Sequence, residues 1–246
     1  MELLVGTLLL RPYVFGFLVV FLLAAAADLG ARRTLLFAGW VWPLAWLAEA
    51  SSTRTGIPFG LYHYTGATRG QELYIADVPL MDSLSFTFLA YASFCLARAA
   101  LARSAPSRAL TALLAGVLMM ALDVVIDPIA VRGDRWFLGR IFYYPAGGVY
   151  FGVPLSNFVG WVVVGAAGVG GYLYLSGGHA GRGCWPGVGL YYAVLGFNLA
   201  VTAWIGEWTL LGVGLAVHAA TALALVSLRR RRHVVPRLGA GGIQRV

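Results

Sequence analysis

Long apolar stretches constrain the fold of this chain more than any other feature of its sequence. A transmembrane helix needs about 20 predominantly apolar residues. Charged residues make up only 11% of the chain, against about 25% in soluble domains. The sequence therefore predicts an all-α fold, a polytopic transmembrane helix bundle of about seven spans. The predicted spans are residues 13–27, 34–50, 80–101, 109–126, 154–175, 187–205 and 208–228.

The placement of the basic residues predicts the orientation of the bundle. All 18 are arginines, and twelve of them fall on the side of the C-terminus when there are seven spans. Short cytoplasmic loops carry an excess of positive charge, so we expect an external N-terminus. We expect one transmembrane domain over residues 1–228 and a basic, disordered cytoplasmic tail over residues 229–246. Short basic runs between apolar segments account for the net charge of +8 without nucleic acid as a partner.

The acidic residues have the opposite distribution. Nine of the ten fall at or near the external side, together with two long loops, roughly residues 51–79 and 128–153. Acidic groups within or at the ends of membrane spans are costly and usually functional. The sequence therefore predicts that the polar chemistry gathers at this side of the bundle.

Asp123 and Asp127 stand at the end of the fourth predicted span. Because they are four residues apart, they share one helix face. Pro128 disfavours helical geometry at Asp127, so we expect the helix to end there. Asp127 is then either a structural residue of the turn or part of a site. Asp123, one turn deeper, is the stronger candidate for a site.

Glu49 follows Trp42 and Trp46 at spacings that place all three on one helix face. A carboxyl group beneath two indoles is poorly hydrated and can remain a neutral acid. The alternative is that the tryptophans belong to an interfacial belt and Glu49 meets water. The irregular, aromatic segment 51–66 that follows is expected to pack over the bundle, because lipid does not tolerate exposed irregular backbone.

Other polar residues of the spans have structural explanations as well as functional ones. Asp82 opens the third span, and Asn157 and Trp161 lie one turn apart in the fifth. Asn198 and Thr202 are expected to bond neighbouring helices together. The same role is favoured for His218 over a role in a site. The sequence contains no cluster with the ligand spacing of a metal site.

Several motifs occur together in one order and spacing across residues 45–161. They are Glu49, Thr55-Gly56-x-Pro58-Phe59-Gly60-x-Tyr62-x-Tyr64, Val78-Pro79, Asp123-x-x-x-Asp127-Pro128, Trp136, and Tyr150-Phe151-Gly152-Val153-Pro154-x-x-Asn157-x-x-Gly160-Trp161. In this combination the chain resembles the membrane carotenoid-biosynthesis hydratases, of the bisanhydrobacterioruberin hydratase and γ-carotene 1′-hydratase type.

The resemblance implies hydration of the terminal C1=C2 double bond of a linear carotenoid end group, giving a tertiary alcohol without a cofactor. It implies a linear or monocyclic carotenoid as substrate, the lipid bilayer of a bacterial or archaeal cell membrane as surroundings, and association with other enzymes of the carotenoid pathway. Such a reaction needs an acid, a shielded carbocation and a positioned water. Either Asp123 or Glu49 is expected to donate the proton, and Asp127 to orient the water. The expected substrate-binding residues are Trp46, Phe59, Tyr62, Tyr64, Asp82, Trp136, Tyr150, Asn157 and Trp161.

Other functions make different demands on the sequence. A retinal-binding photoreceptor is excluded, because the Schiff base requires a lysine and the chain has none. A transporter or channel needs ionisable residues through the depth of the bundle, whereas here they gather near one side. A carotenoid cyclase or isomerase begins from the same cation, and the residues alone do not separate it from a hydratase. A non-catalytic carotenoid or lipid binder would tolerate loss of Asp123 and Glu49.

Overall fold

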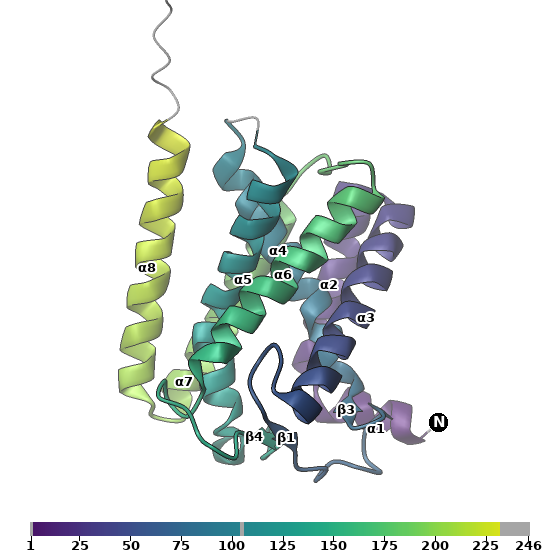
Figure 1. Cartoon of the computed structure of the whole chain (residues 1–246), viewed down its shortest axis with the longest axis vertical. Coiled ribbons are helices and arrows are strands. Elements are labelled where there is room, and N and C mark those ends of the chain that lie inside the picture. Colours follow the sequence, from purple (N-terminus) through teal and green to yellow (C-terminus); the bar gives the residue numbers. More distant parts are fainter. Residues whose placement is uncertain (1, 104–105, 232–246) are drawn as a thin grey trace, which may run out of the picture.

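Within the described part of the chain, seven long helices run between the two ends of the bundle, and a short helix precedes them (Figure 1). The computed structural model describes residues 2–103 and 106–231. Its helices are α1 (Glu2–Leu10), α2 (Pro12–Leu29), α3 (Ala31–Thr55), α4 (Leu80–Leu101), α5 (Arg108–Ala130), α6 (Leu155–Leu175), α7 (Trp185–Trp204) and α8 (Trp208–Arg231). The prediction of an all-α helix bundle is confirmed.

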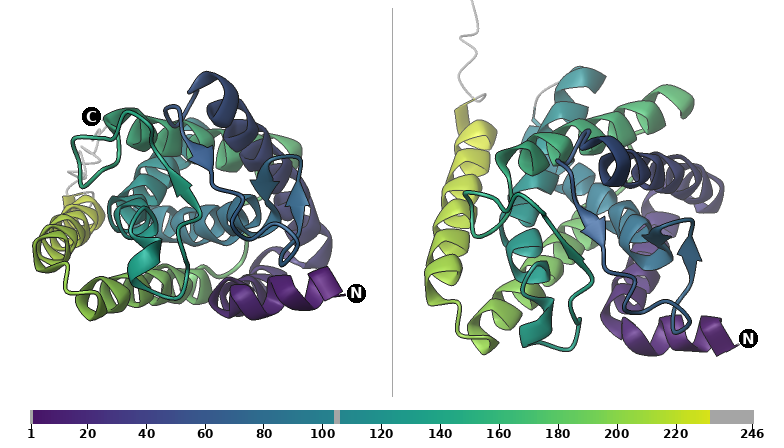
Figure 2. Two further views of the ribbon diagram at one scale, coloured as in Figure 1. Left: turned by 90° about the horizontal axis from the view of Figure 1, so that it is seen from below. Right: turned by 60° about the horizontal axis from the view of Figure 1, so that its bottom comes forward.

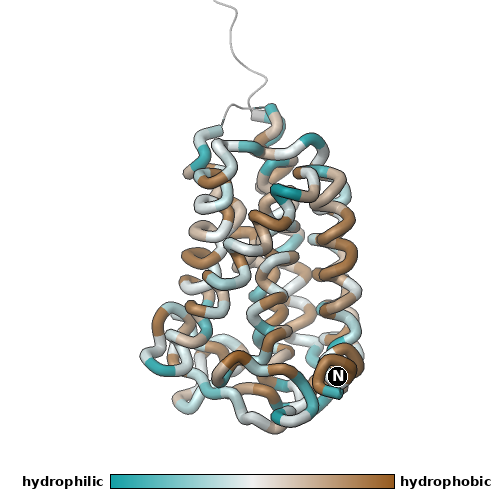
Figure 3. The backbone as a smooth tube through the Cα atoms, turned by 90° about the vertical axis from the view of Figure 1, so that its right-hand side faces the viewer, coloured by the Kyte–Doolittle hydropathy of each residue, from teal (hydrophilic) through white to brown (hydrophobic). Residues whose placement is uncertain are grey.

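Six of these helices, α2 and α4 to α8, are long and apolar enough to cross a membrane. The remaining predicted span, residues 34–50, lies within α3. That helix is long enough at 25 residues but is less apolar, because it contains charged residues and three tryptophans. Strongly hydrophilic residues lie mostly towards the two ends of the bundle (Figure 3), as expected for an integral membrane protein.

Helix α4 occupies the centre of the bundle. It contacts α2, α3, α5, α6, α7 and α8, and the view along the bundle shows the other helices arranged around it (Figure 2). Every residue from 86 to 97 is buried, which is more than three helical turns. The outermost helix, α8, instead exposes large side chains such as Leu215 and Leu223.

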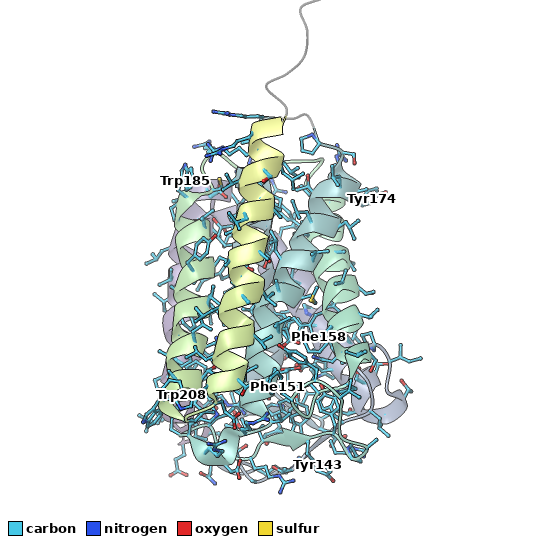
Figure 4. The ribbon with its side chains drawn as sticks, turned by 90° about the vertical axis from the view of Figure 1, so that its left-hand side faces the viewer. Tyr143, Phe151, Phe158, Tyr174, Trp185 and Trp208 are labelled. Atoms are coloured by element: carbon cyan, nitrogen blue, oxygen red, sulfur yellow. The ribbon has the colours of Figure 1, made fainter. Side chains whose placement is uncertain are left out.

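Exposed aromatic side chains flank the bundle at both ends. Tyr174 and Trp185 project near one end and Trp208 near the other (Figure 4). Tryptophan and tyrosine are enriched at both membrane–water interfaces. Their placement is consistent with a bilayer lying between these two levels.

The two long connections pack together at the end of the bundle that also carries α1 (Figure 1). Strand β1 (His63–Tyr64) in the first connection pairs antiparallel with β4 (Phe142–Tyr143) in the second. The first connection also forms the small hairpin of β2 (Tyr74–Ile75) and β3 (Val78–Pro79). The second includes a 3₁₀ turn, η1 (Gly133–Arg135). Both long loops therefore lie on one side, as the sequence predicted.

The first loop reaches the helices because Gly160 leaves room for it on α6. A Cβ atom at Gly160 would lie 2.5 Å from a ring carbon of Phe59 and 2.8 Å from the carbonyl oxygen of Pro58. The Phe59 amide is in turn bound by the Ser52 hydroxyl, which accepts its hydrogen bond at 2.9 Å. A glycine and a serine thus fix the loop against α3 and α6.

Helix α5 continues to Ala130, so the prediction that it ends at Asp127 is wrong. Pro128 has no N–H, which leaves the carbonyl of Val124 without its usual helical partner. The Tyr150 hydroxyl donates a hydrogen bond to that carbonyl at 3.2 Å. A side chain from the loop thereby replaces the missing backbone bond and allows the helix to pass through the proline.

Two further predictions about polar residues have different outcomes. Asn198 and Thr202 donate side-chain hydrogen bonds to carbonyls of their own helix, to Val194 at 2.9 Å and to Asn198 at 2.7 Å, so these bonds do not join helices as expected. His218 of α8 interacts with the carbonyl of Ala121 on α5, and this agrees with its predicted inter-helix role. Helix α8 extends three residues into the predicted tail, and residues 232–246 lie outside the described part of the chain.

Candidate active site

A cavity of about 140 Å³ lies at the loop end of the bundle. Its walls come from helices α2 to α7 and from both long loops. Nine of the twelve residues that the sequence singled out line it. They are Glu49, Phe59, Tyr62, Tyr64, Asp82, Asp127, Trp136, Asn157 and Trp161.

Asn157 of α6 connects the two aspartates of α5. Its side-chain amide donates hydrogen bonds to Asp123 at 2.6 Å and to Asp127 at 2.7 Å. Asp123 is completely buried and does not line the cavity, whereas Asp127 does. Asp127 and Asn157 therefore line the cavity, and Asp123 lies behind them.

Glu49 enters the same cavity from the last turns of α3. It is 5% exposed, and its Oε2 atom is buried without a hydrogen-bond partner in the described residues. The Tyr64 side chain lies close enough to interact with the carboxyl groups of both Glu49 and Asp82. Two carboxyl groups, Glu49 and Asp127, thus approach one space from different helices.

Aromatic rings form most of the wall between these carboxyl groups. Phe86 and Trp161 stack with their ring centroids 4.4 Å apart, and Phe59 packs at a tilt against both. Burial raises the pKa of Tyr62 and that of Tyr64 well above the usual range. Both tyrosines therefore remain neutral phenols at physiological pH.

Asp82 is tied into a buried ion cluster that the sequence did not predict. Arg11, at the junction of α1 and α2, donates hydrogen bonds to Asp82 and, at 2.7 Å, to Glu72. Burial opposes the charge of Arg11, but the carboxylates of Asp82 and Glu72 keep its pKa above its ordinary value. The guanidinium group therefore compensates charge at the edge of the cavity.

Three of the predicted site residues lie outside the cavity. Asp123 is behind Asp127, as described above. The Trp46 indole turns to the first loop and donates a hydrogen bond to the carbonyl of Ile75 at 3.2 Å. Tyr150 contacts Phe151 and Phe158 and supports α5 through Val124. These three side chains instead contact the residues that form or support the cavity wall.

Replacing Tyr150 by phenylalanine is expected to lower the stability of the fold and to have a smaller effect on the binding of a ligand. The variant keeps the ring but leaves the Val124 carbonyl unpaired, at a cost of about 1 kcal/mol. We expect the melting temperature of the detergent-solubilised protein to fall by a few degrees. Tyr143→Phe, at an exposed position of β4, is the matched control and should leave it unchanged. Equal melting temperatures for Tyr150→Phe and the unaltered protein would contradict this role.

No group of three or more His, Cys, Asp or Glu side chains that could hold a metal ion is found within residues 2–103 and 106–231. The carboxyl groups of the cavity face aromatic rings, an asparagine amide and an arginine instead. Carboxyl groups in apolar, aromatic surroundings suit acid–base chemistry on an apolar molecule.

Comparisons with known proteins give matches that concern carotenoid biosynthesis. Bisanhydrobacterioruberin hydratase of Haloarcula japonica is 31% identical over 121 residues, which cover 49% of this chain and 38% of that relative. The chain thus spans well under two thirds of the length of the curated relative it matches. No solved structure matches the chain. The family model described as "Carotenoid biosynthesis protein" matches residues 9–225. Because this match covers most of the sequence, the chain belongs to the carotenoid biosynthesis protein family.

Proposed function

We propose that this protein is a carotenoid hydratase that adds water across the terminal C1=C2 double bond of a linear carotenoid end group. One observation carries the proposal: two carboxyl groups from different helices, Glu49 and Asp127, line a single cavity with aromatic walls. Membership of the carotenoid biosynthesis family and the similarity to a hydratase support it.

Glu49 is the proton donor in this mechanism. Its unpaired, buried Oε2 atom disfavours a negative charge, so the group is held as a neutral acid. Transfer of its proton to C2 converts the double bond into a tertiary carbocation at C1. Asp123 is the alternative donor that the sequence left open, but it has no place on the cavity wall. Glu49 is therefore the better candidate of the two.

The aromatic walls stabilise the cation. The rings of Trp161, Phe86 and Phe59 line the same cavity as the two carboxyl groups and pack against one another. Cation–π attraction is worth up to about 2 kcal/mol or more in a desolvated site. The same rings keep out additional water, so that the cation meets only a positioned molecule.

Asp127 acts as the base for that water. Asn157 fixes its carboxyl group on the cavity wall through a 2.7 Å hydrogen bond. The water oxygen bonds to C1, and its proton passes to Asp127. The product is a tertiary alcohol. Return of a proton from Asp127 to Glu49, through Tyr64 or solvent, restores the starting state, so that one water is consumed and no other group is needed.

The membrane orientation is part of the proposal. With the C-terminus in the cytoplasm, the loop end of the bundle and its carboxyl groups face the outside of the cell membrane. The arginine distribution supports this orientation, because twelve of the eighteen lie on the other side. Water then reaches the cavity from the external surface.

Expression in a lycopene-producing bacterium tests the function directly. Pigments are extracted and analysed by chromatography and mass spectrometry, with the membrane fraction probed for the protein. We expect a more polar pigment that is heavier by one water. An isomer of unchanged mass would identify a cyclase or isomerase instead. If lycopene remains unchanged while the protein is in the membrane, hosts making monocyclic and C50 carotenoids decide the matter, and no hydrated pigment in any of the three refutes the proposal.

A further inference from the structure

The cavity has a second, apolar part that the proposed chemistry does not use. It extends away from Glu49 and Asp127 along three helices, with walls from α2, α4 and α7. We refer to this part as the apolar arm. Its lining residues are Val14, Phe17, Phe88, Leu89, Val194 and Phe197.

The apolar arm is buried at its back and reaches the edge of the bundle at its front. Its back wall is the central helix α4, where Phe88 and Leu89 are buried. At its front, α2 and α7 pack side by side at the edge of the bundle (Figure 2). Only the front of the arm therefore faces the surroundings of the protein.

Aromatic side chains close this front. The rings of Phe17 on α2 and Phe197 on α7 meet edge to face with centroids 5.8 Å apart, and Phe197 also stacks on Tyr13 at 4.9 Å. Phe17 and Phe197 are partly exposed. Each follows an exposed glycine, Gly16 or Gly196, where an added Cβ would meet nothing within 4 Å. The two rings thus close a seam with open space in front of it.

The size of the cavity requires such a seam if the substrate is a carotenoid. Pockets that enclose drug-sized ligands measure about 300–1,000 Å³, and this cavity measures about 140 Å³. It can hold the end group and the first part of the chain, but not a C40 molecule. The remainder of the polyene has to leave the protein, and an apolar chain leaves most favourably into lipid.

We infer that the polyene leaves the cavity between α2 and α7, through a lateral opening that Phe17 and Phe197 close in this structure. The apolar arm is then the binding subsite for the conjugated segment next to the reacting end, and the long remainder lies in the bilayer. This inference rests on the proposed carotenoid substrate. It adds the direction from which the substrate enters and the two rings that must move.

Substrates of two lengths test the inference. One is a C40 carotenoid with an unreacted linear end, and the other is a short acyclic terpenoid with the same end and a tail too short to pass the rings. Phe17→Trp and Phe197→Trp narrow the seam, and Phe197→Ala widens it. Tyr192→Trp, at an exposed position of α7, is the control for added bulk.

The measured quantity is the ratio of kcat/KM for the long substrate to that for the short one. Either tryptophan variant should lower this ratio about tenfold or more, because overpacking hinders passage of the chain. Phe197→Ala should preserve or raise the ratio, and the Tyr192→Trp control should leave the ratio unchanged. An unchanged ratio in both tryptophan variants, or equal loss for both substrates, would overturn the inference.

A binding measurement separates this inference from the proposed reaction. The purified protein is incubated with the C40 carotenoid in detergent, and the retained pigment is measured by its visible absorption. The tryptophan variants should retain much less pigment than the control, whether or not hydration occurs. If the unaltered protein retains pigment that the tryptophan variants lose, but forms no alcohol, the function proposed above fails and the opening stands. If all variants retain pigment equally, the opening between α2 and α7 is refuted.

Discussion

Replacing Glu49 by glutamine is expected to abolish carotenoid hydration, with a loss of about a thousandfold or more. The glutamine amide has nearly the same shape but cannot donate an acidic proton, and general acid–base groups contribute about 10²–10⁴ to rates. Asp127→Asn should cause a comparable loss, because an amide cannot accept the proton of the attacking water. Pigment analysis by mass spectrometry measures the hydrated product in equal amounts of membrane protein.

Two further variants test whether the loss of hydration is specific to the proposed acid and base. Asp77→Asn removes an exposed carboxylate of the first loop and should leave hydration intact. Asp123→Asn should reduce activity less than Asp127→Asn, because Asp123 acts by holding Asn157 and Asp127 in place. Hydration at the unaltered rate in Glu49→Gln would remove Glu49 from the mechanism. A greater loss in Asp123→Asn than in Glu49→Gln would make Asp123 the donor.

Replacing Arg11 by methionine is expected to cause a larger loss of stability than replacing Tyr150 by phenylalanine. Arg11 is 2% exposed and compensates the carboxylates of Glu72 and Asp82. Removal of one partner from a buried ion pair costs about 3–5 kcal/mol, because the opposite charge remains buried. We expect a fall in melting temperature of roughly ten degrees or more, measured by tryptophan fluorescence in detergent.

A rescue experiment separates charge from packing at this position. Combining Arg11→Met with Glu72→Gln and Asp82→Asn removes all three charges, and neutral replacement of a whole buried ion cluster is often tolerated. The triple variant should recover most of the lost stability. If it unfolds as readily as Arg11→Met alone, the contribution of Arg11 is packing of its side chain and not compensation of charge.

The fold could be predicted from the sequence because membrane spans are defined by local composition. A run of apolar residues identifies a span without knowledge of its neighbours. The same runs predicted where most of the long helices begin and end. The end of α5 was not predicted correctly. Helix α5 passes Pro128 because the Tyr150 hydroxyl binds the Val124 carbonyl, and these two residues are 26 positions apart. Local sequence contains no sign of that contact.

The site was predictable to the extent that acidic residues within apolar segments are unusual. Glu49, Asp123 and Asp127 were singled out in this way. The spacing of the aspartates predicted a shared helix face, which agrees with the hydrogen bonds that both accept from Asn157. Arg11 was not identified, because its partners lie 61 and 71 residues away. A lone arginine between two apolar helices was the available signal that this residue is buried.

The central position of α4 has a consequence for how the protein tolerates change. A helix at the surface of a bundle has a lipid-facing side on which most apolar residues are interchangeable, whereas α4 is enclosed on every side from residue 86 to residue 97. Substitutions there alter packing whatever their direction. A saturation library should therefore show a continuous block of intolerant positions in α4, without the three- to four-residue rhythm of permissive sites expected along α8.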